Sequence, residues 1–167
     1  MVRVRRSIKR TLRIVGEGYA EQYFLEHLRA TYLRRTGSIS LKITNARGKG
    51  GKAVLDHALR PQIRAGFDSI AVLVDTDQDW NDAQRCRAKN NGIVVLESDP
   101  CLERVLLEIH GTVVTGSSRQ LKREFNTRFG LDAHDVRVYQ ERFKKATIDL
   151  ARKRIAMLDQ LLKLPGQ

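Results

Sequence analysis

The feature of this sequence that most constrains its fold is an uninterrupted apolar run, Ile70 to Val74. The run is short and rich in β-branched residues, which is typical of a strand covered by other structure on both faces. Strands of this kind occur mainly in parallel sheets, because the crossover helices of such sheets lie on both faces. The run therefore indicates an α/β fold.

The segments around this run alternate between strand and helix patterns. Strand patterns occur at Thr11–Val15, at about 39–43 and at Ile93–Leu96. Helical spacing of apolar residues occurs between them, over about 19–35, 54–63 and 82–91, with Pro61 as a kink or early end. This alternation predicts crossover units and a parallel central sheet of about four strands flanked by helices.

From Pro100 to the end of the chain the pattern is helical, over about 100–109, 119–129 and 140–162. Asp99 and Pro100 are expected to start the first of these helices, as N-cap and first helical residue. The 167 residues suit one hydrophobic core. We therefore expect a single domain over 1–167, with an α/β core at about 10–110 and a helical C-terminal extension at about 111–167.

The chain is strongly basic, with 31 Lys and Arg against 19 Asp and Glu and a net charge of +12. Such an excess favours polyanionic partners, so we expect nucleic acid, DNA or RNA, over the alternative that the charge serves solubility alone. Acidic residues nevertheless outnumber basic ones between 65 and 103. An acidic patch in a basic protein suits a cation site that faces a polyanion.

Other classes of protein are disfavoured. No apolar run approaches the ~20 residues that span a bilayer, so no membrane partner is expected. The basic N-terminal segment lacks the apolar core of a secretory signal. Cys86 and Cys101 are too few for a disulfide scaffold and lack metal-ligand spacing. These features predict a cytoplasmic protein.

Carboxylates follow two of the predicted strands. Glu17 comes just after the first strand, and Asp75, Asp77 and Asp79 come just after the central one. Because the carboxyl ends of parallel strands meet at one edge of the sheet, these side chains could converge on one ion. Mg²⁺, or Mn²⁺, suits oxygen ligands of this kind. The alternative is that Asp-X-Asp serves ordinary loop or helix-capping chemistry, and Asp79 is expected to be a solvated loop residue.

Three segments follow one another along the chain: Gly16-Glu17-Gly18-Tyr19-Ala20-Glu21 with Tyr23-Phe24 after it, Asp75-Thr76-Asp77, and the segment from Asp99 to His110. In this order they resemble the Toprim domain, and most closely the RloB-like group of OLD/RloB-type nucleases. The chain departs from that group at three positions. Asp99 stands where Asn is usual, Leu102 where an aromatic residue is usual, and Val105 where Trp is usual. The resemblance implies a Toprim-like, Rossmann-like fold. It also implies Mg²⁺-dependent nuclease activity and a role in antiviral defence. It makes Glu17 a catalytic acid/base or metal ligand, and Asp75 and Asp77 metal ligands.

Two further acids are candidates beside these. Glu21 lies one helical turn beyond Glu17 and could add a metal ligand, or it could be a solvated first-turn acid favoured by the helix dipole. Glu103 and His110 share a helix face and could bind metal or orient substrate. Under the resemblance Glu103 is a second catalytic candidate, whereas a surface or capping role is the alternative for both residues.

Basic residues supply the candidate nucleic-acid contacts. Arg47, Lys49 and Lys52 lie in a glycine-rich loop that opens a helix, a favourable place for phosphate. The loop lacks Walker spacing, so an NTPase site is rejected. Lys144 and Lys145 could track a phosphate backbone or belong to a solvated face.

Two functional hypotheses remain. The first is phosphodiester hydrolysis by a metal-dependent nuclease. The second is a non-catalytic nucleic-acid-binding Toprim module or a subunit of a larger nucleoprotein complex. Either form could act as a homodimer or with a defence-system partner protein.

Overall fold

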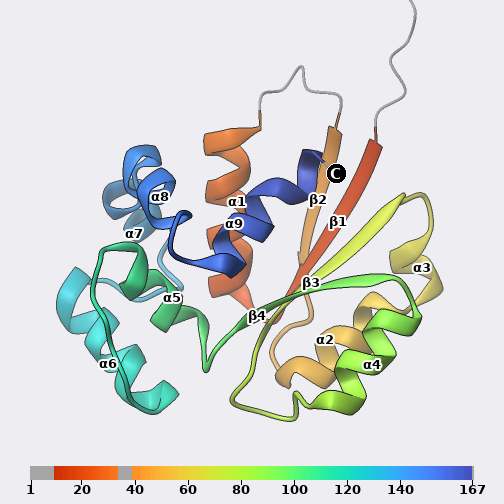
Figure 1. Cartoon of the computed structure of the whole chain (residues 1–167), viewed down its shortest axis with the longest axis horizontal. Coiled ribbons are helices and arrows are strands. Elements are labelled where there is room, and N and C mark those ends of the chain that lie inside the picture. Colours follow the sequence, from red (N-terminus) through yellow and green to blue (C-terminus); the bar gives the residue numbers. More distant parts are fainter. Residues whose placement is uncertain (1–9, 34–38, 167) are drawn as a thin grey trace, which may run out of the picture.

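The computed structural model describes residues 10–33 and 39–166. Its centre is one sheet of four parallel strands in the order β2-β1-β3-β4 (Figure 1). The strands are β1 (Arg10–Gly16), β2 (Ile39–Asn45), β3 (Ser69–Asp75) and β4 (Ile93–Ser98). The predicted α/β class, with a parallel sheet of about four strands flanked by helices, is confirmed.

Helices connect each strand to the next. They are α1 (Tyr19–Tyr32), α2 (Gly50–Ala58), α3 (Pro61–Arg64) and α4 (Asp82–Asn90). Residues 34 and 35, at the predicted end of the first helix, and the basic residues within 1–9 lie outside the described part of the chain. Pro61 begins the short helix α3, where its fixed backbone angle and missing N–H suit a first turn.

Side chains of the central strands alternate between two hydrophobic layers. Leu12 and Leu73 face the layer that contains α1, and Val15 and Val72 face the layer that contains α2 and α4. Figure 1 shows α1 and α9 on one side of the sheet and α2 and α4 on the other. The sheet is therefore covered on both faces, as the continuous apolar run in β3 predicts.

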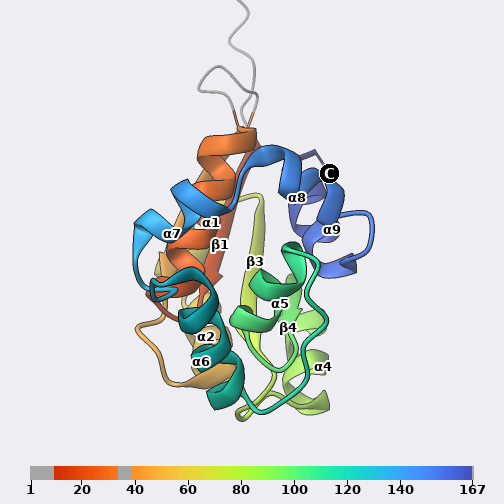
Figure 2. The ribbon, with the colours of Figure 1, turned by 90° about the vertical axis from the view of Figure 1, so that its left-hand side faces the viewer.

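The remaining helices continue from β4: α5 (Leu102–Ile109), α6 (Ser118–Phe129), α7 (Val136–Arg142), α8 (Lys145–Ala151), α9 (Ala156–Lys163) and the 3₁₀ helix η1 (Leu164–Gly166). Figure 2 shows α6 and α7 on the side of the molecule beside α5 and α1. Phe125, Tyr139, Ile148 and Leu158 belong to the same buried cluster as Leu12 of the sheet. The C-terminal helices thus complete one layer of the core.

Two expectations about helices are wrong. The single helix expected over 140–162 is divided among α7, α8 and α9, because the chain leaves helical geometry at buried Phe143 and again before Ile155. Asp99 and Pro100 do not start a helix, since α5 begins at Leu102 with Cys101 as its N-cap. The Pro100 carbonyl accepts hydrogen bonds from the amides of Thr76 and Asp77, which holds residues 99–101 against the loop after β3.

No described helix combines the length and the apolar character that crossing a bilayer requires. The C-terminal residues Leu164 and Pro165 lie beside Arg10, Ile39 and Ser69 at the amino ends of three strands.

Candidate functional site

The sheet has a point at which the chain reverses its direction of winding. From β1 the chain crosses through α1 on one face to reach β2, and then returns through α2 and α3 on the opposite face to reach β3. Crevices form at such points, outside the carboxyl ends of the strands. Glu17 follows β1 and Asp75 ends β3, so both lie at this crevice.

A cleft of about 140 Å³ opens at this crevice, and we call it the acidic cleft. Four predicted site carboxylates line it, those of Glu17, Glu21, Asp75 and Glu103. The other lining residues are Gly18, Ala20, Gly48, Lys122 and His134. The fifth predicted carboxylate, Asp77, is exposed and does not line the cleft, but its charge acts on both Glu17 and Asp75.

Gly16 sets the position of Glu21. A Cβ atom at Gly16 would lie 2.7 Å from the Cβ of Glu21, so only hydrogen fits there. This close approach lets α1 start directly over the end of β1. The Oε2 of Glu21 accepts the Gly18 N–H over 2.8 Å, which satisfies a free amide at the start of the helix. Glu21 is only 6% exposed, so the alternative that it is a solvated first-turn acid is wrong.

The loop before α2 sets the position of Glu17. Its backbone carbonyl accepts the Gly48 N–H over 2.8 Å, and its Oε1 accepts the Gly50 N–H over 3.2 Å. Its Oε2 is buried and has no hydrogen-bond partner among the described residues. Buried oxygens of this kind are rare because desolvation costs free energy when no donor replaces water. Glu17 is therefore a candidate ligand with a free oxygen.

Asp75 and Glu103 are brought together by the start of α5. The Oδ1 of Asp75 accepts the Leu102 N–H over 3.0 Å, which ties the end of β3 to the first turn of that helix. Glu103 is the next residue and is 5% exposed. The alternative of a surface role for Glu103 is therefore wrong. His110, at the other end of α5, packs against Phe129 and Phe143 and does not line the cleft.

The cleft concentrates negative charge. Within residues 10–33 and 39–166, neither Asp77 nor any of the four lining carboxylates forms a salt bridge. Burial, with the charges of Glu21 and Glu17, raises the pKa of Asp75 to about 9. Burial also raises the pKa of Glu17 and of Glu21. Without a cation the cleft therefore retains protons that ordinary carboxyl groups release.

Lys122 of α6 lines the same cleft. Burial lowers its pKa, but the surrounding negative charges together, led by those of Glu103 and Asp75, raise the pKa overall. His134 also lines the cleft, and its Nδ1 lies 2.6 Å from the Oδ1 of Asp132. Sequence reasoning missed both residues, because they lie in the segment expected to be an extension. No motif marks them.

The donor set fits a hard divalent cation, since carboxylate oxygens are the ligands that Mg²⁺ prefers. Glu17 has an oxygen without a partner, and Glu21 and Asp75 each have one oxygen bonded to an amide. As the side chains stand, however, no group of three or more His, Cys, Asp or Glu in the described residues is close enough to hold an ion. Binding would therefore require side-chain rotation in the cleft.

The predicted basic contacts lie in different places. Arg47 and Lys49 line a separate pocket next to the cleft, whereas Lys52 pairs with Asp56 on α2. Lys145 pairs with Asp149 within α8, and the Nζ of its neighbour Lys144 donates to the Gln140 carbonyl. None of these five candidate nucleic-acid contacts lines the acidic cleft in the described structure.

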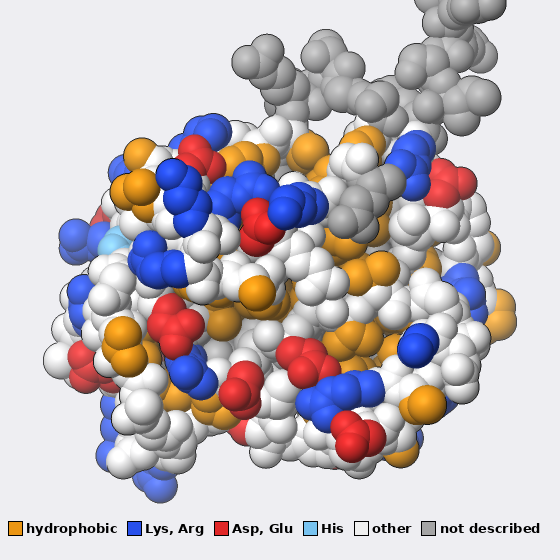
Figure 3. All heavy atoms as spheres, viewed as in Figure 1, with side chains coloured by type: hydrophobic (Ala, Val, Ile, Leu, Met, Phe, Trp, Pro, Cys, Tyr) orange, Lys and Arg blue, Asp and Glu red, His pale blue; other side chains and the backbone are white. Residues whose placement is uncertain are grey.

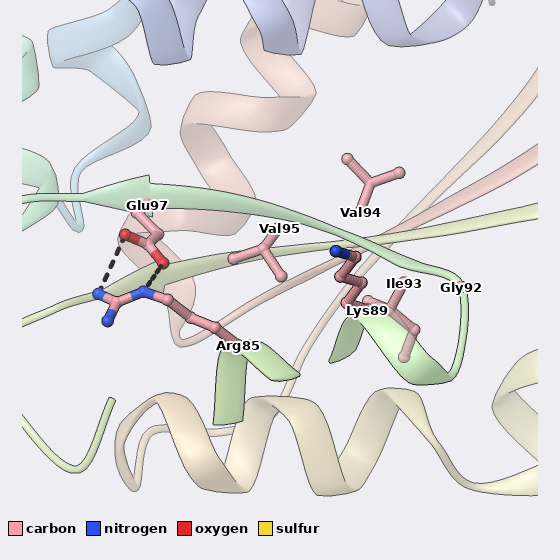
Figure 4. A pocket seen from close by; sticks show the side chains of 7 residues that line it. All are labelled: Arg85, Lys89, Gly92, Ile93, Val94, Val95 and Glu97. Carbon is pink, nitrogen blue, oxygen red and sulfur yellow. Dashed lines mark hydrogen bonds and ion pairs between the residues drawn. The ribbon is translucent and has the colours of Figure 1, made fainter. Parts of the chain in front are cut away.

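A shallow groove of about 500 Å³ runs beside the edge strand β4 and is separate from the cleft (Figure 4). Its polar members include Arg85 and Glu97, which form an ion pair, and Glu97 also accepts the indole N–H of Trp80. On the face seen in Figure 3, Lys and Arg side chains are interspersed with Asp and Glu side chains and form no single basic surface.

Fold and cleft together define an α/β protein with a doubly covered parallel sheet and a buried carboxylate cluster at its switch point. Comparisons with protein-family models, with curated proteins and with solved structures each found no match.

Proposed function

We propose that this protein is a metal-dependent nuclease of the Toprim type, which hydrolyses phosphodiester bonds of DNA or RNA with Mg²⁺ or Mn²⁺. The observation that carries the proposal is the convergence of Glu17, Glu21, Asp75 and Glu103 on one cleft without salt bridges among the described residues. Burial and mutual repulsion raise the pKa of Glu17, Glu21 and Asp75, so these groups can all be ionised at little cost only when a cation lies among them.

The candidate site residues have distinct proposed roles. A bound divalent cation supplies polarisation of the phosphoryl oxygen and neutralisation of developing charge. Asp75 and Asp77, with Glu21, are the proposed ligands. Glu17 is the proposed acid/base, because burial raises its pKa toward the working pH and one of its oxygens is free to exchange a proton. Lys122 is suited to hold a phosphate oxygen opposite the carboxylates.

A nuclease assay tests the proposal. Purified protein is incubated with labelled single- and double-stranded DNA and RNA in Mg²⁺, Mn²⁺ or EDTA, beside the variants Asp75→Ala and Asp82→Ala. Asp82 is the matched control, because it is an exposed acid at the start of α4 and does not line the cleft. We expect cleavage by the wild type and by Asp82→Ala, and loss of cleavage in EDTA and in Asp75→Ala. Equal cleavage by all three proteins would identify a contaminant and refute the proposal.

One observation favours the second hypothesis, a nucleic-acid-binding module without catalysis. Glu21 and Asp75 each accept an amide hydrogen bond at the start of a helix, so both carboxylates also have a structural role. Binding that depends on salt, with no cleavage of any substrate in either metal, would support this module over the nuclease. Activity that appears only with an added partner protein would support a subunit of a larger complex. We also propose, together with the nuclease activity, a role in antiviral defence and assembly as a homodimer.

A further inference from the structure

A second pocket lies on the other side of the loop that holds Glu17. Its volume is about 610 Å³, and we call it the basic pocket. It is lined by residues of β2, the following loop, α2 and α3: Thr44, Asn45, Ala46, Arg47, Lys49, Ala53, His57, Arg60 and Ile63. No Asp or Glu is among these described lining residues. The pocket therefore has basic side chains and no acidic ones.

The basic side chains of this pocket have no acidic partners. Arg47, Lys49, His57 and Arg60 form no salt bridge with any described carboxylate, although every Asp and Glu of the chain lies in the described ranges. By contrast, the nearby Lys52 pairs with Asp56. Unpaired positive charges that share one pocket repel one another, and a bound anion relieves that repulsion.

A buried arginine adds to the positive potential. Arg13 is 6% exposed and stacks over the ring of Phe67 at 4.2 Å. Its Nη1 donates over 2.7 Å to the carbonyl of Ile63, which is a lining residue of the pocket. Burial lowers the pKa of His57, and the charges of Arg60, Arg13 and Arg47 lower it further. The pKa of His57 is therefore sensitive to the positive potential of three arginines.

The pocket also has a hydrogen-bonding group without a partner. The hydroxyl oxygen of Thr44 is buried and has no hydrogen bond among the described residues. Arg47 and Lys49 have φ angles of 65° and 120°, a region that side-chain-bearing residues seldom adopt. Strain of this kind persists where the surroundings impose it and is common at binding sites.

The basic pocket adjoins the acidic cleft. Gly48 lines the cleft, whereas its two neighbours in sequence, Arg47 and Lys49, line the pocket. Consecutive Cα atoms are ~3.8 Å apart, so one short loop separates the two cavities. A strand whose reacting phosphate lies in the cleft would therefore carry a neighbouring phosphate past the pocket.

We propose that the basic pocket binds a phosphate group of a nucleic-acid strand, next to the phosphate that lies in the acidic cleft. The chemistry of recognition is ion pairing from Arg47, Lys49 and Arg60, with the Thr44 hydroxyl as a further donor. The position next to the reacting phosphate rests on the proposed function. Phosphate binding by the pocket does not, because it requires no metal.

The first test measures His57 directly. The imidazole signal of His57 is followed by NMR over a pH titration in EDTA, with and without inorganic phosphate, and assigned with His57→Ala. A bound anion stabilises the imidazolium, so we expect phosphate to raise the pKa of His57 in the wild type and not in Arg60→Ala. His110, which lines neither the basic pocket nor the acidic cleft of the described structure, is the internal control. An unchanged His57 titration at saturating phosphate would overturn the proposal.

The second test measures strand binding without cleavage. Fluorescence anisotropy of a labelled single-stranded oligonucleotide is recorded in EDTA for wild type, Arg60→Ala, Asp75→Asn and the control Lys153→Ala, an exposed lysine outside the pocket. We expect Arg60→Ala to weaken binding roughly tenfold and to reduce the salt dependence by about one ion. Equal losses in Arg60→Ala and Lys153→Ala would overturn the proposal.

Two further comparisons separate the outcomes. Oligonucleotides with a terminal phosphate or a terminal hydroxyl distinguish a strand end from an internal phosphodiester as the occupant. If the terminal phosphate strengthens binding only when Arg60 is present, the occupant is a strand end.

Asp75→Asn is expected to lose cleavage and keep binding in EDTA. Absence of cleavage in the wild type, with Arg60-dependent binding intact, would refute the nuclease and leave the pocket supported.

Discussion

The backbone N–H of Leu102 donates to the Oδ1 of Asp75 over 3.0 Å, so the last residue of β3 holds the first residue of α5. This bond places Glu103 beside Asp75 and fixes one wall of the acidic cleft. The same aspartate interacts unfavourably with the charges of Glu21, Glu17 and Glu103. Asp75 therefore positions the cleft and also carries much of its electrostatic cost.

We expect the stability of the metal-free protein to fall as pH rises from about 5 to about 8, and Asp75→Asn to reduce this dependence. The pKa of Asp75 is about 9 in the folded protein, above its ordinary value of 3.8. Between these values the native state keeps a proton that the unfolded chain has lost, so each pH unit costs up to about 1.4 kcal/mol. Urea unfolding in EDTA at several pH values measures the slope. Asp82→Asn is the control, and an equal slope in both variants would contradict this expectation.

We expect Mg²⁺ to stabilise the wild type against thermal unfolding and to have a smaller effect on Asp75→Asn. A ligand that binds only the folded state adds about 2.7 kcal/mol when its concentration is 100 times its Kd. Differential scanning calorimetry in Mg²⁺ and in EDTA measures the shift. NaCl at matched ionic strength controls for general screening. A shift of the same size in NaCl would show that no specific cation site exists.

Gly50→Ala is expected to destabilise the fold by about 1–3 kcal/mol and to disturb Glu17, because it strains the backbone and displaces the Asp79 carboxylate that accepts the Lys52 N–H. Gly50 has a φ of 81°, and a Cβ atom there would lie 2.5 Å from the Oδ1 of Asp79. Gly92→Ala is the matched control, because Gly92 has a φ of 67° but open space around its missing Cβ. Chemical denaturation compares the two variants. If both lose equal stability, backbone strain alone accounts for the effect and the close contact does not matter.

Phe125→Ala is expected to cost about 3–5 kcal/mol and to weaken the whole domain. Phe125 is fully buried in the cluster that includes Leu12 and Leu73 of the sheet. Circular dichroism and tryptophan fluorescence should report one common, earlier unfolding transition. The control Val113→Ala, at a site that is 89% exposed, should stay within about 0.5 kcal/mol of the wild type. Separate unfolding transitions for the sheet and the helices would mean that α6 unfolds independently of the sheet.

The sheet and the main carboxylates could be predicted from the sequence because their patterns are local. A continuous apolar run marks β3, and the residues that follow β1 and β3 are at the carboxyl ends of strands wherever the helices pack. Glu17 and Asp75 both line the acidic cleft for this reason.

Other parts depend on contacts between distant segments. Lys122 reaches the cleft because α6 packs against α5, and His134, in the loop after α6, lines the cleft together with Ala20 of α1. Nothing in the sequence neighbourhood of Lys122 or His134 indicates this. The same holds for Arg60 and His57, which share a pocket with the loop after β2. The division of 140–162 into three helices has no Pro or Gly to mark it, since packing of Phe143 and Ile155 decides where the chain turns.

The contact between Gly16 and Glu21 has a consequence for recognising other chains with this site. Because any side chain at position 16 would push α1 away from the strand, Glu21 cannot join the other three acids without a hydrogen atom at that place. A search pattern built from acidic residues alone would accept chains that cannot form the cleft. A useful pattern requires glycine before the first glutamate as strictly as it requires the acids themselves.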